Sequence, residues 1–160
     1  MTRIEPETGF TLFEIMLAVA IIGLLAMVMI PSFTSHEDEQ KLTMASTELV
    51  DGLRFARNEA MRTGSAFRVE IDNDNDRFVV TDLSGSAGQT VYHPVNKKPY
   101  GIDFATSMIY SGVDINGSSK IDIDFTARGL TDADRVITLS YGSFSTQIMV
   151  ESTSGRITSL

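Results

Sequence analysis

Cysteine is absent from this chain of 160 residues. This absence excludes disulfide bonds, thiol nucleophiles and cysteine-based metal sites, although it does not identify a cellular compartment. The two histidines, His36 and His93, lie far apart, and neither belongs to a metal-ligand motif. The chain also lacks a Gly-x-Ser-x-Gly elbow and a glycine-rich phosphate loop. We therefore expect no catalytic residue, metal or cofactor, and we interpret both histidines as surface residues.

Positive charge is also scarce. The 13 lysines and arginines stand against 21 aspartates and glutamates, which gives a formal net charge of −8. Lys97-Lys98 is the only adjacent basic pair, so no basic stripe for binding phosphates can be traced. We expect no nucleic-acid partner.

One long apolar run lies near the N-terminus. Residues 10–30 contain a single charged residue, Glu14, and Pro31 follows the run. As an α-helix, the run would be roughly 30 Å long, which matches the hydrocarbon core of a bilayer. A carboxylate in lipid is costly, so Glu14 is a candidate functional residue. Thr11-x-x-Glu14 also has the form of a helix capping box.

These residues resemble the N-terminus of type IV pilin-like proteins. The stretch Gly9-Phe10-Thr11-Leu12-Phe13-Glu14 places a glycine, a hydrophobic residue, Thr-Leu and an acid ahead of the long apolar run. In that family a dedicated membrane peptidase cuts after the glycine and methylates the new amino group. The resemblance implies cleavage between Gly9 and Phe10, N-methylation of Phe10, and a role for Glu14 in the entry of the subunit into a filament.

Two other interpretations of the N-terminus compete with this one. Ala18-Val19-Ala20 has the small-x-small form of a signal peptidase site. Cleavage there would leave residues 21–30 as an exposed apolar terminus, which water disfavours. An inert anchor helix, in which Glu14 only caps the first turn, would need no glycine leader. We favour the pilin-like interpretation.

The helix is expected to continue beyond the apolar run as far as Gly64. A kink is predicted at Pro31, because proline lacks an N–H and clashes with the preceding turn. Apolar residues then recur at steps of three and four and form one helical stripe: Leu42, Ala45, Leu49, Leu53, Ala56 and Ala60. We interpret Arg54, Arg57, Glu59 and Arg62 as a solvated face, with a local pair between Glu59 and Arg62.

From residue 66 the hydrophobic period changes to two. Strands are predicted at 67–72, 77–81, 89–93, 121–125, 136–141, 145–150 and 156–158. Gly142-Ser143 suits a two-residue hairpin turn with glycine first. Residues 72–76 alternate Asp and Asn as calcium loops do, but Arg77 and Leu83 stand where such a loop needs glycine and glutamate. We predict a polar turn there, and loops at 84–88 and 95–112.

A helix followed by strands predicts an α+β fold, with an antiparallel sheet packed on the helix. The resemblance specifies this as a pseudopilin fold with a long, membrane-spanning N-terminal helix. The expected organisation is a cleaved leader at 1–9, a transmembrane segment at 10–30, an amphipathic continuation of the helix at 31–64, and a periplasmic antiparallel β domain at 65–160.

The second half of the chain is similar to the H-type minor pseudopilins (the GspH/FimT family). The segment 54–64 leading into Phe67-Arg68-Val69 is similar to their helix-to-strand junction, and Phe125 with Gly129 and Gly155-Arg156-Ile157 fit the same pattern. The resemblance implies a structural subunit of the periplasmic pseudopilus in type II protein secretion. It also implies a bacterial inner-membrane location and these partners: the prepilin peptidase, the major pseudopilin, other minor pseudopilins and the inner-membrane assembly platform.

Two further classes of function remain. Relatives of this family serve in type IV pili and DNA uptake, so a DNA-binding minor pilin is the alternative, which the negative charge disfavours. A salt-dependent DNA-binding measurement would separate it from a purely structural subunit. A membrane-anchored enzyme is the third class, and no catalytic constellation supports it.

The predicted processing can be tested by intact mass. Protein from its native host should lack residues 1–9 and carry one added methyl group, because the peptidase is expected to cut before Phe10 and methylate it. A mature chain that begins at Ile21 would contradict this prediction and support an ordinary secretory signal.

Overall fold

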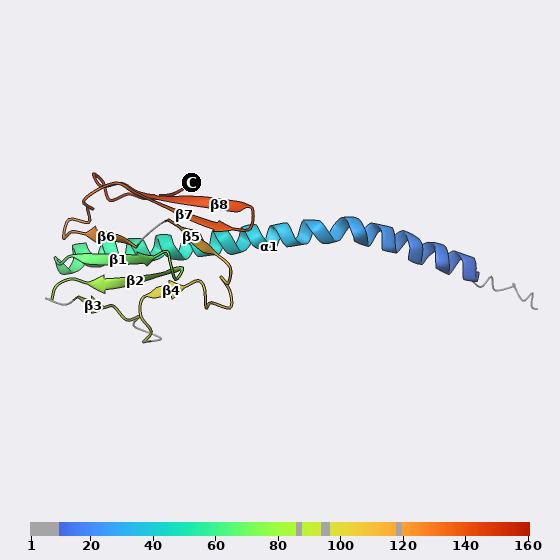
Figure 1. Ribbon diagram of the computed structural model, residues 1–160, viewed down its shortest axis with the longest axis horizontal. Coiled ribbons are helices and arrows are strands. Elements are labelled where there is room, and N and C mark those ends of the chain that lie inside the picture. The colour runs from blue at the N-terminus through green and yellow to red at the C-terminus, as the bar shows by residue number, and fades with distance from the viewer. Residues whose placement is uncertain (1–9, 86–87, 94–96, 118–119) are drawn as a thin grey trace, which may run out of the picture. The chain divides into compact units, whose positions relative to one another are not determined.

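The computed structural model describes residues 10–85, 88–93, 97–117 and 120–160, and the side chains of 28–35 lie outside this description. The described residues form one helix and nine strands (Figure 1). Their bounds are α1 Leu12–Thr63, β1 Phe67–Asp72, β2 Arg77–Asp82, β3 Gln89–Thr90, β4 Gly101–Asp103, β5 Asp114–Asn116, β6 Ile121–Phe125, β7 Arg135–Tyr141, β8 Phe144–Val150 and β9 Ile157–Ser159. The chain divides into two units, Met1–Glu37 and Asp38–Leu160.

The helix α1 ends where the sequence predicts. Gly64 follows its last residue, Thr63, and adopts a left-handed conformation with φ of 70°. The Gly64 N–H donates to the carbonyl of Ala60 at 3.0 Å, which satisfies one of the last free carbonyls of the helix. The helix also continues through Pro31. The kink predicted at Pro31 falls among the residues whose side chains are not described, so it stays a prediction.

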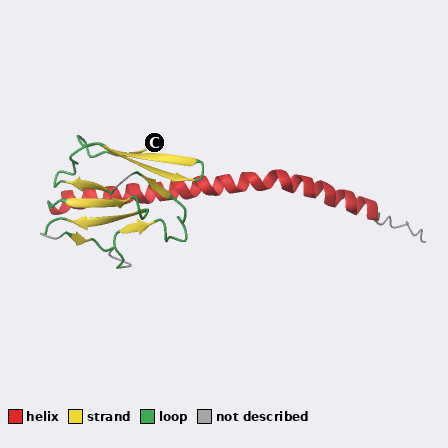
Figure 2. Cartoon of the chain, viewed as in Figure 1, coloured by secondary structure: helices red, strands yellow, loops and turns green. Residues whose placement is uncertain are grey.

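The strands form two antiparallel sheets (Figure 2). The first sheet has the order β3-β2-β1-β6, and β4 pairs with β2 beyond the end of β3. The second sheet has the order β5-β7-β8-β9. The predicted α+β class and antiparallel pairing are confirmed. The prediction of one sheet is wrong. The strands form two sheets, and the inward-facing residues of both sheets pack on the same helix.

The core of the second unit contains the predicted stripe of α1. All six of its residues are buried, and three of them, Ala45, Ala56 and Ala60, are alanines that let the sheets approach the helix closely. The first sheet contributes residues such as Val69, Phe78 and Ile123, and the second contributes Ile137, Leu139 and Ile148. Each fully buried side chain of this size contributes roughly 1.5–3 kcal/mol. Burial in one cluster therefore ties both sheets to the helix.

On the face of the first sheet that points away from the core, charged residues alternate with the apolar ones and form ion pairs between strands. Arg68 on β1 lies across from Asp124 on β6 and donates to its carboxylate at 2.6 and 2.7 Å. A second ion pair joins Arg68 to Asp122 at 2.9 Å. The hydrogen bond with Asp124 raises the pKa of the Arg68 guanidinium. This cluster is a structural cross-strand contact.

Both predicted turns are present. Tyr141 pairs with Phe144, so Gly142 and Ser143 form a two-residue loop, and the φ of 58° at Gly142 is the conformation that favours glycine. Residues 73–76 join β1 to β2 as a polar turn. Within it, the carboxylate of Asp76 accepts the N–H of Ile115 at 2.8 Å, and its carbonyl accepts the N–H of Phe104 at 2.8 Å.

The strands β4 and β5 are absent from the sequence-based prediction. The loop predicted at 95–112 is wrong at β4, and β5 begins two residues after the end of that predicted loop. Each strand has three residues, which is too few to show a period of two, and long-range contacts with the Asp76 turn and with β2 and β7 fix their positions. The predicted strand at 89–93 is also longer than β3, which ends at Thr90.

Arg57 departs from the predicted solvated face. Its Nε donates to the carbonyl of Gly129 at 3.1 Å, and its Nη2 donates to the carbonyl of Ser154 at 3.0 Å. A Cβ added at Gly155 would collide with the Gly129 carbonyl and approach Arg57 Nε at 2.8 Å. The pair between Glu59 and Arg62, in contrast, is present as predicted, at 2.6 Å. Residues that carry the H-type resemblance thus meet at one junction around Arg57.

The second unit is expected to fold without the first. A fragment of residues 38–160 should be monomeric and unfold cooperatively in urea, because the stripe of α1 is covered by its own sheets. Sedimentation and urea titration would measure both properties. Aggregation or gradual unfolding would mean that another subunit must cover the stripe.

Two glycine substitutions in that fragment distinguish the stability cost of backbone strain from the stability cost of a steric collision. Gly64→Ala should cost about 1 kcal/mol, because φ is positive but no atom lies within 4 Å of the added Cβ. Gly155→Ala should cost about 3 kcal/mol, because the Cβ also collides with the Gly129 carbonyl. Equal midpoints in urea unfolding for the two variants would show that the junction around Arg57 accommodates the added Cβ without further loss of stability.

Candidate functional site

The candidate site lies at the start of α1, where Thr11 and Glu14 form a reciprocal capping box. The Glu14 N–H donates to Thr11 Oγ1 at 3.3 Å. The Thr11 N–H and hydroxyl donate to Glu14 Oε2 at 3.0 and 3.1 Å. The bonds satisfy backbone donors that have no partner within the helix, which explains why α1 begins here.

Both capping bonds to the Glu14 side chain end on the same oxygen. Among the described residues, Oε1 of Glu14 has no hydrogen bond, and no basic side chain pairs with this carboxylate. The acid therefore caps the helix with one oxygen while the other can still accept a cationic group. Capping and charge pairing are thus compatible roles for one side chain.

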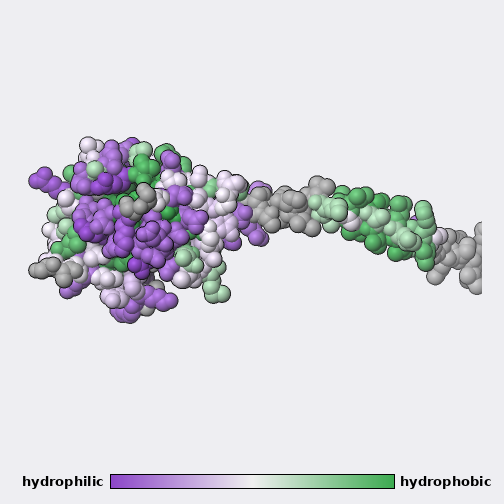
Figure 3. Space-filling model, viewed as in Figure 1, coloured by the Kyte–Doolittle hydropathy of each residue, from purple (hydrophilic) through white to green (hydrophobic). Residues whose placement is uncertain are grey.

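The surroundings of this acid are apolar and uncovered. Every residue from Phe10 to Met27 is exposed, although most are large hydrophobic side chains, and Figure 3 shows this stretch of α1 as hydrophobic. The exposed fractions reach 83% at Phe10 and 73% at Phe13. A helix that is apolar on all sides needs lipid or other helices around it.

Within the part of the chain that the structure describes, no helix offers a stretch long and apolar enough to cross a membrane.

The structure brings together only part of the predicted site. Phe10 lies two residues before the start of α1 and four residues from Glu14. Gly9, on the other side of the predicted cleavage point, lies outside the described residues. Cleavage, methylation and the kink at Pro31 therefore stay predictions.

Elsewhere, the described residues hold no group of three or more acidic, histidine or cysteine side chains arranged to bind a metal. His36 is exposed as predicted, and His93 is half-buried, with its ring 5.8 Å from that of Tyr100. With Glu48, His93 and Tyr100 line a cavity of about 320 Å³. Sequence reasoning missed this cavity because its lining comes from α1, β2, β4 and the loop before β4, which are far apart in the sequence.

The chain matches no protein-family model. It is 38% identical to a fimbrial protein of Pseudomonas aeruginosa over 60 residues, which are 38% of each chain. It is 33% identical to type II secretion system protein H of Klebsiella pneumoniae over 82 residues, which are 51% of this chain and 47% of that protein. The matched segments span less than half the length of either relative. The chain resembles type IV pilins and H-type secretion proteins.

Solved structures support the same fold. The minor pseudopilin EpsH from the type II secretion system of Vibrio cholerae aligns with a TM-score of 0.56 at 16% identity, over 75% of this chain and 96% of that one. The type IV minor pilin FimU of Pseudomonas aeruginosa aligns with a TM-score of 0.54 at 17% identity, over 75% of this chain and 88% of that one. The pseudopilin-like fold predicted from the sequence is thereby confirmed.

Proposed function

We propose that this chain is a minor pseudopilin, a structural subunit of the periplasmic pseudopilus in type II protein secretion. The observation that carries the proposal is the single carboxylate of Glu14, which caps an exposed apolar helix and keeps one oxygen available. The similarity to secretion protein H and the EpsH fold support the same class. The minor pilin of a type IV pilus is the related alternative, and the FimU fold is compatible with it.

In this proposal, residues 10–30 insert into the bacterial inner membrane, and the domain from residue 65 lies in the periplasm. The side chains described from Phe10 to Met27 are apolar apart from Thr11 and Glu14, which suits contact with lipid. The prepilin peptidase removes residues 1–9 and leaves a methylated amino group on Phe10. The inner-membrane assembly platform then transfers the subunit to the filament.

The assembly step in this proposal is a charge pair in a medium with little water. The new amino group of one subunit is cationic, and Glu14 of an adjacent subunit is its opposite charge. Opposite charges attract more strongly where water is scarce, and a carboxylate left alone there is costly. Because one axial stagger brings the two groups together, the pair also selects the offset between neighbouring helices. The major pseudopilin is the expected neighbour, along with other minor pseudopilins.

The roles of capping and pairing can be separated by two variants. Glu14→Gln keeps an oxygen that can cap the helix but loses the charge, so it should be inserted and cleaved yet co-purify with the major subunit on the order of tenfold less than the wild type. Thr11→Ala removes the capping hydroxyl and keeps the charge, so it should assemble nearly normally. The measurement is recovery of each cleaved variant with the major subunit in the native host.

If Glu14→Gln assembles like the wild type while Thr11→Ala does not, capping is the sufficient role of Glu14. The charge-pair mechanism would then be wrong.

A further inference from the structure

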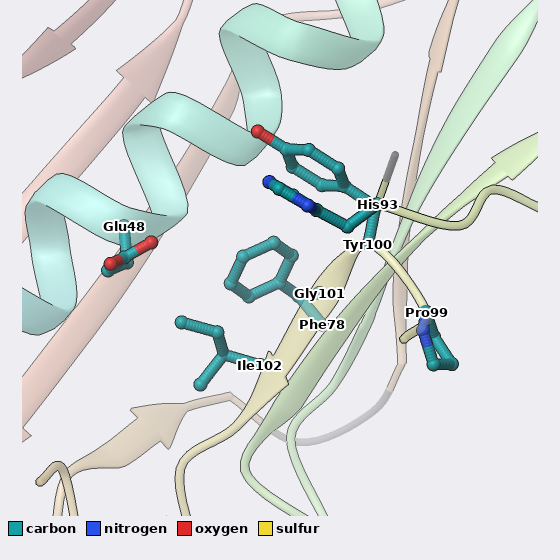
Figure 4. A pocket seen from close by; sticks show the side chains of 7 residues that line it. All are labelled: Glu48, Phe78, His93, Pro99, Tyr100, Gly101 and Ile102. Atoms are coloured by element: carbon teal, nitrogen blue, oxygen red, sulfur yellow. The ribbon is translucent and has the colours of Figure 1, made fainter. Parts of the chain in front are cut away.

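A cavity of about 320 Å³ lies against α1 in the unit Asp38–Leu160 (Figure 4). Apolar side chains form one part of its lining, with Phe78 and Ile102 on the strands and Pro99 on the preceding loop, and polar groups form the larger part of its surface. Glu48 faces these apolar side chains from the helix. The volume is near the lower end for ligand pockets, so it suits a small group.

The aromatic side of the cavity is held in place by stacking. The ring of Tyr100 lies 3.9 Å from that of Phe55 on α1, with an angle of 6° between the planes. His93 stacks on Tyr100 at 5.8 Å. The Tyr100 hydroxyl points toward the helix in Figure 4. Rings fixed in this way give a wall that needs little ordering when a ligand enters.

The polar side of the cavity combines the exposed carboxylate of Glu48 with the imidazole of His93. One oxygen of Glu48 accepts the hydroxyl of Tyr110 at 3.3 Å, and among the described residues the side chain makes no other hydrogen bond or ion pair. Burial, followed by the charges of Asp51 and Glu48, raises the pKa of the Tyr100 hydroxyl. Lys97 and Lys98 belong to the same loop as Pro99 but do not line the cavity. An apolar wall beside a carboxylate with a free oxygen is the complement of a cation on an aliphatic stem.

We propose that this cavity binds an alkyl cation, either an ammonium or a guanidinium group. The aliphatic stem lies against Phe78 and Ile102, and the head group donates to Glu48 and to the hydroxyl oxygen of Tyr100. This chemistry matches the end of a lysine or arginine side chain on a neighbouring subunit and also a free small amine. The binding chemistry stands on the cavity alone, and the assignment to a subunit rests on the proposed function.

The binding chemistry is tested with n-butylammonium and its neutral counterpart n-butanol. The full chain in maltoside micelles at low salt is titrated with each probe, and binding is followed by ligand-observed NMR. Butylammonium should bind in the millimolar range, about threefold more tightly than butanol. Glu48→Gln should abolish this preference. Glu39→Gln, which removes the same charge from the same helix nine residues earlier, should keep it.

Tyr100→Phe provides a variant that preserves the stack on Phe55. It should weaken butylammonium binding and leave butanol binding unchanged, since only the hydroxyl is lost. Equal affinity of the wild-type chain for both probes would overturn the proposal. An equal effect of Glu48→Gln and Glu39→Gln would overturn it as well, because binding would then follow overall charge.

The source of the cation is tested in the native host. Recovery of Glu48→Gln and Glu39→Gln is compared in the fraction of sheared filaments. Selective loss of Glu48→Gln from this fraction assigns the cation to a neighbouring subunit. Equal recovery of the two variants, when the wild-type chain binds butylammonium, assigns the cation to a free amine. If the wild-type chain is itself absent from the filament fraction while butylammonium still binds, the proposed function fails and the cavity keeps its assignment.

Discussion

The buried stripe of α1 from Leu42 to Ala60 is the interaction on which the second unit depends. Two short-stranded sheets share it, and neither sheet has a second layer of its own among the described residues. The mixture of leucine and alanine in the stripe sets the spacing, because leucine fills the space between the sheets and alanine lets their strands approach the helix. Gly52 on the same helix shows how tight this packing is, since a Cβ there would meet the Phe78 ring. Small residues on α1 are therefore as constrained as large ones.

Periodicity predicted most of this fold because the periodic elements are also the buried ones. The stripe of α1 and the alternating residues of β1 and β6 face the core, so their spacing in sequence reports their packing directly. The division into two sheets could not be predicted in this way, because alternation shows that a strand has a buried face but not which strand lies beside it. The strands β4 and β5 depend on Asp76, whose carboxylate and carbonyl act across tens of residues. Such contacts have no local sequence pattern.

The candidate site and the cavity also differ in whether their contacts are local in the sequence. The capping box of Thr11 and Glu14 is local, three residues apart, and was visible in the sequence. The cavity beside Tyr100 was not, because Glu48 on α1 and Tyr100 before β4 are far apart in the sequence and neither belongs to a motif. Arg57 also makes contacts that its local sequence does not predict. On helical spacing alone it belongs with a solvated face, yet it holds the carbonyls of Gly129 and Ser154, which only the tertiary fold brings to it.

Glu14 and Glu48 share an arrangement that bears on how this chain selects its neighbours. Each is a carboxylate on α1, one oxygen of which is engaged by a hydroxyl group of the chain while the other has no hydrogen bond among the described residues. A chain with a net charge of −8 is repelled by other acidic surfaces, so general electrostatic attraction cannot assemble such subunits. The electrostatic part of the attraction must instead come from localised pairs, in which a cation meets one of these oxygens beside apolar surface. Localised pairs penalise a wrong partner or register more than they add to affinity, because a carboxylate brought into contact without its cation is left unpaired. In the proposed filament, Glu14 would then select the stagger of the helices, and Glu48 would select the side chain that lies against the domain.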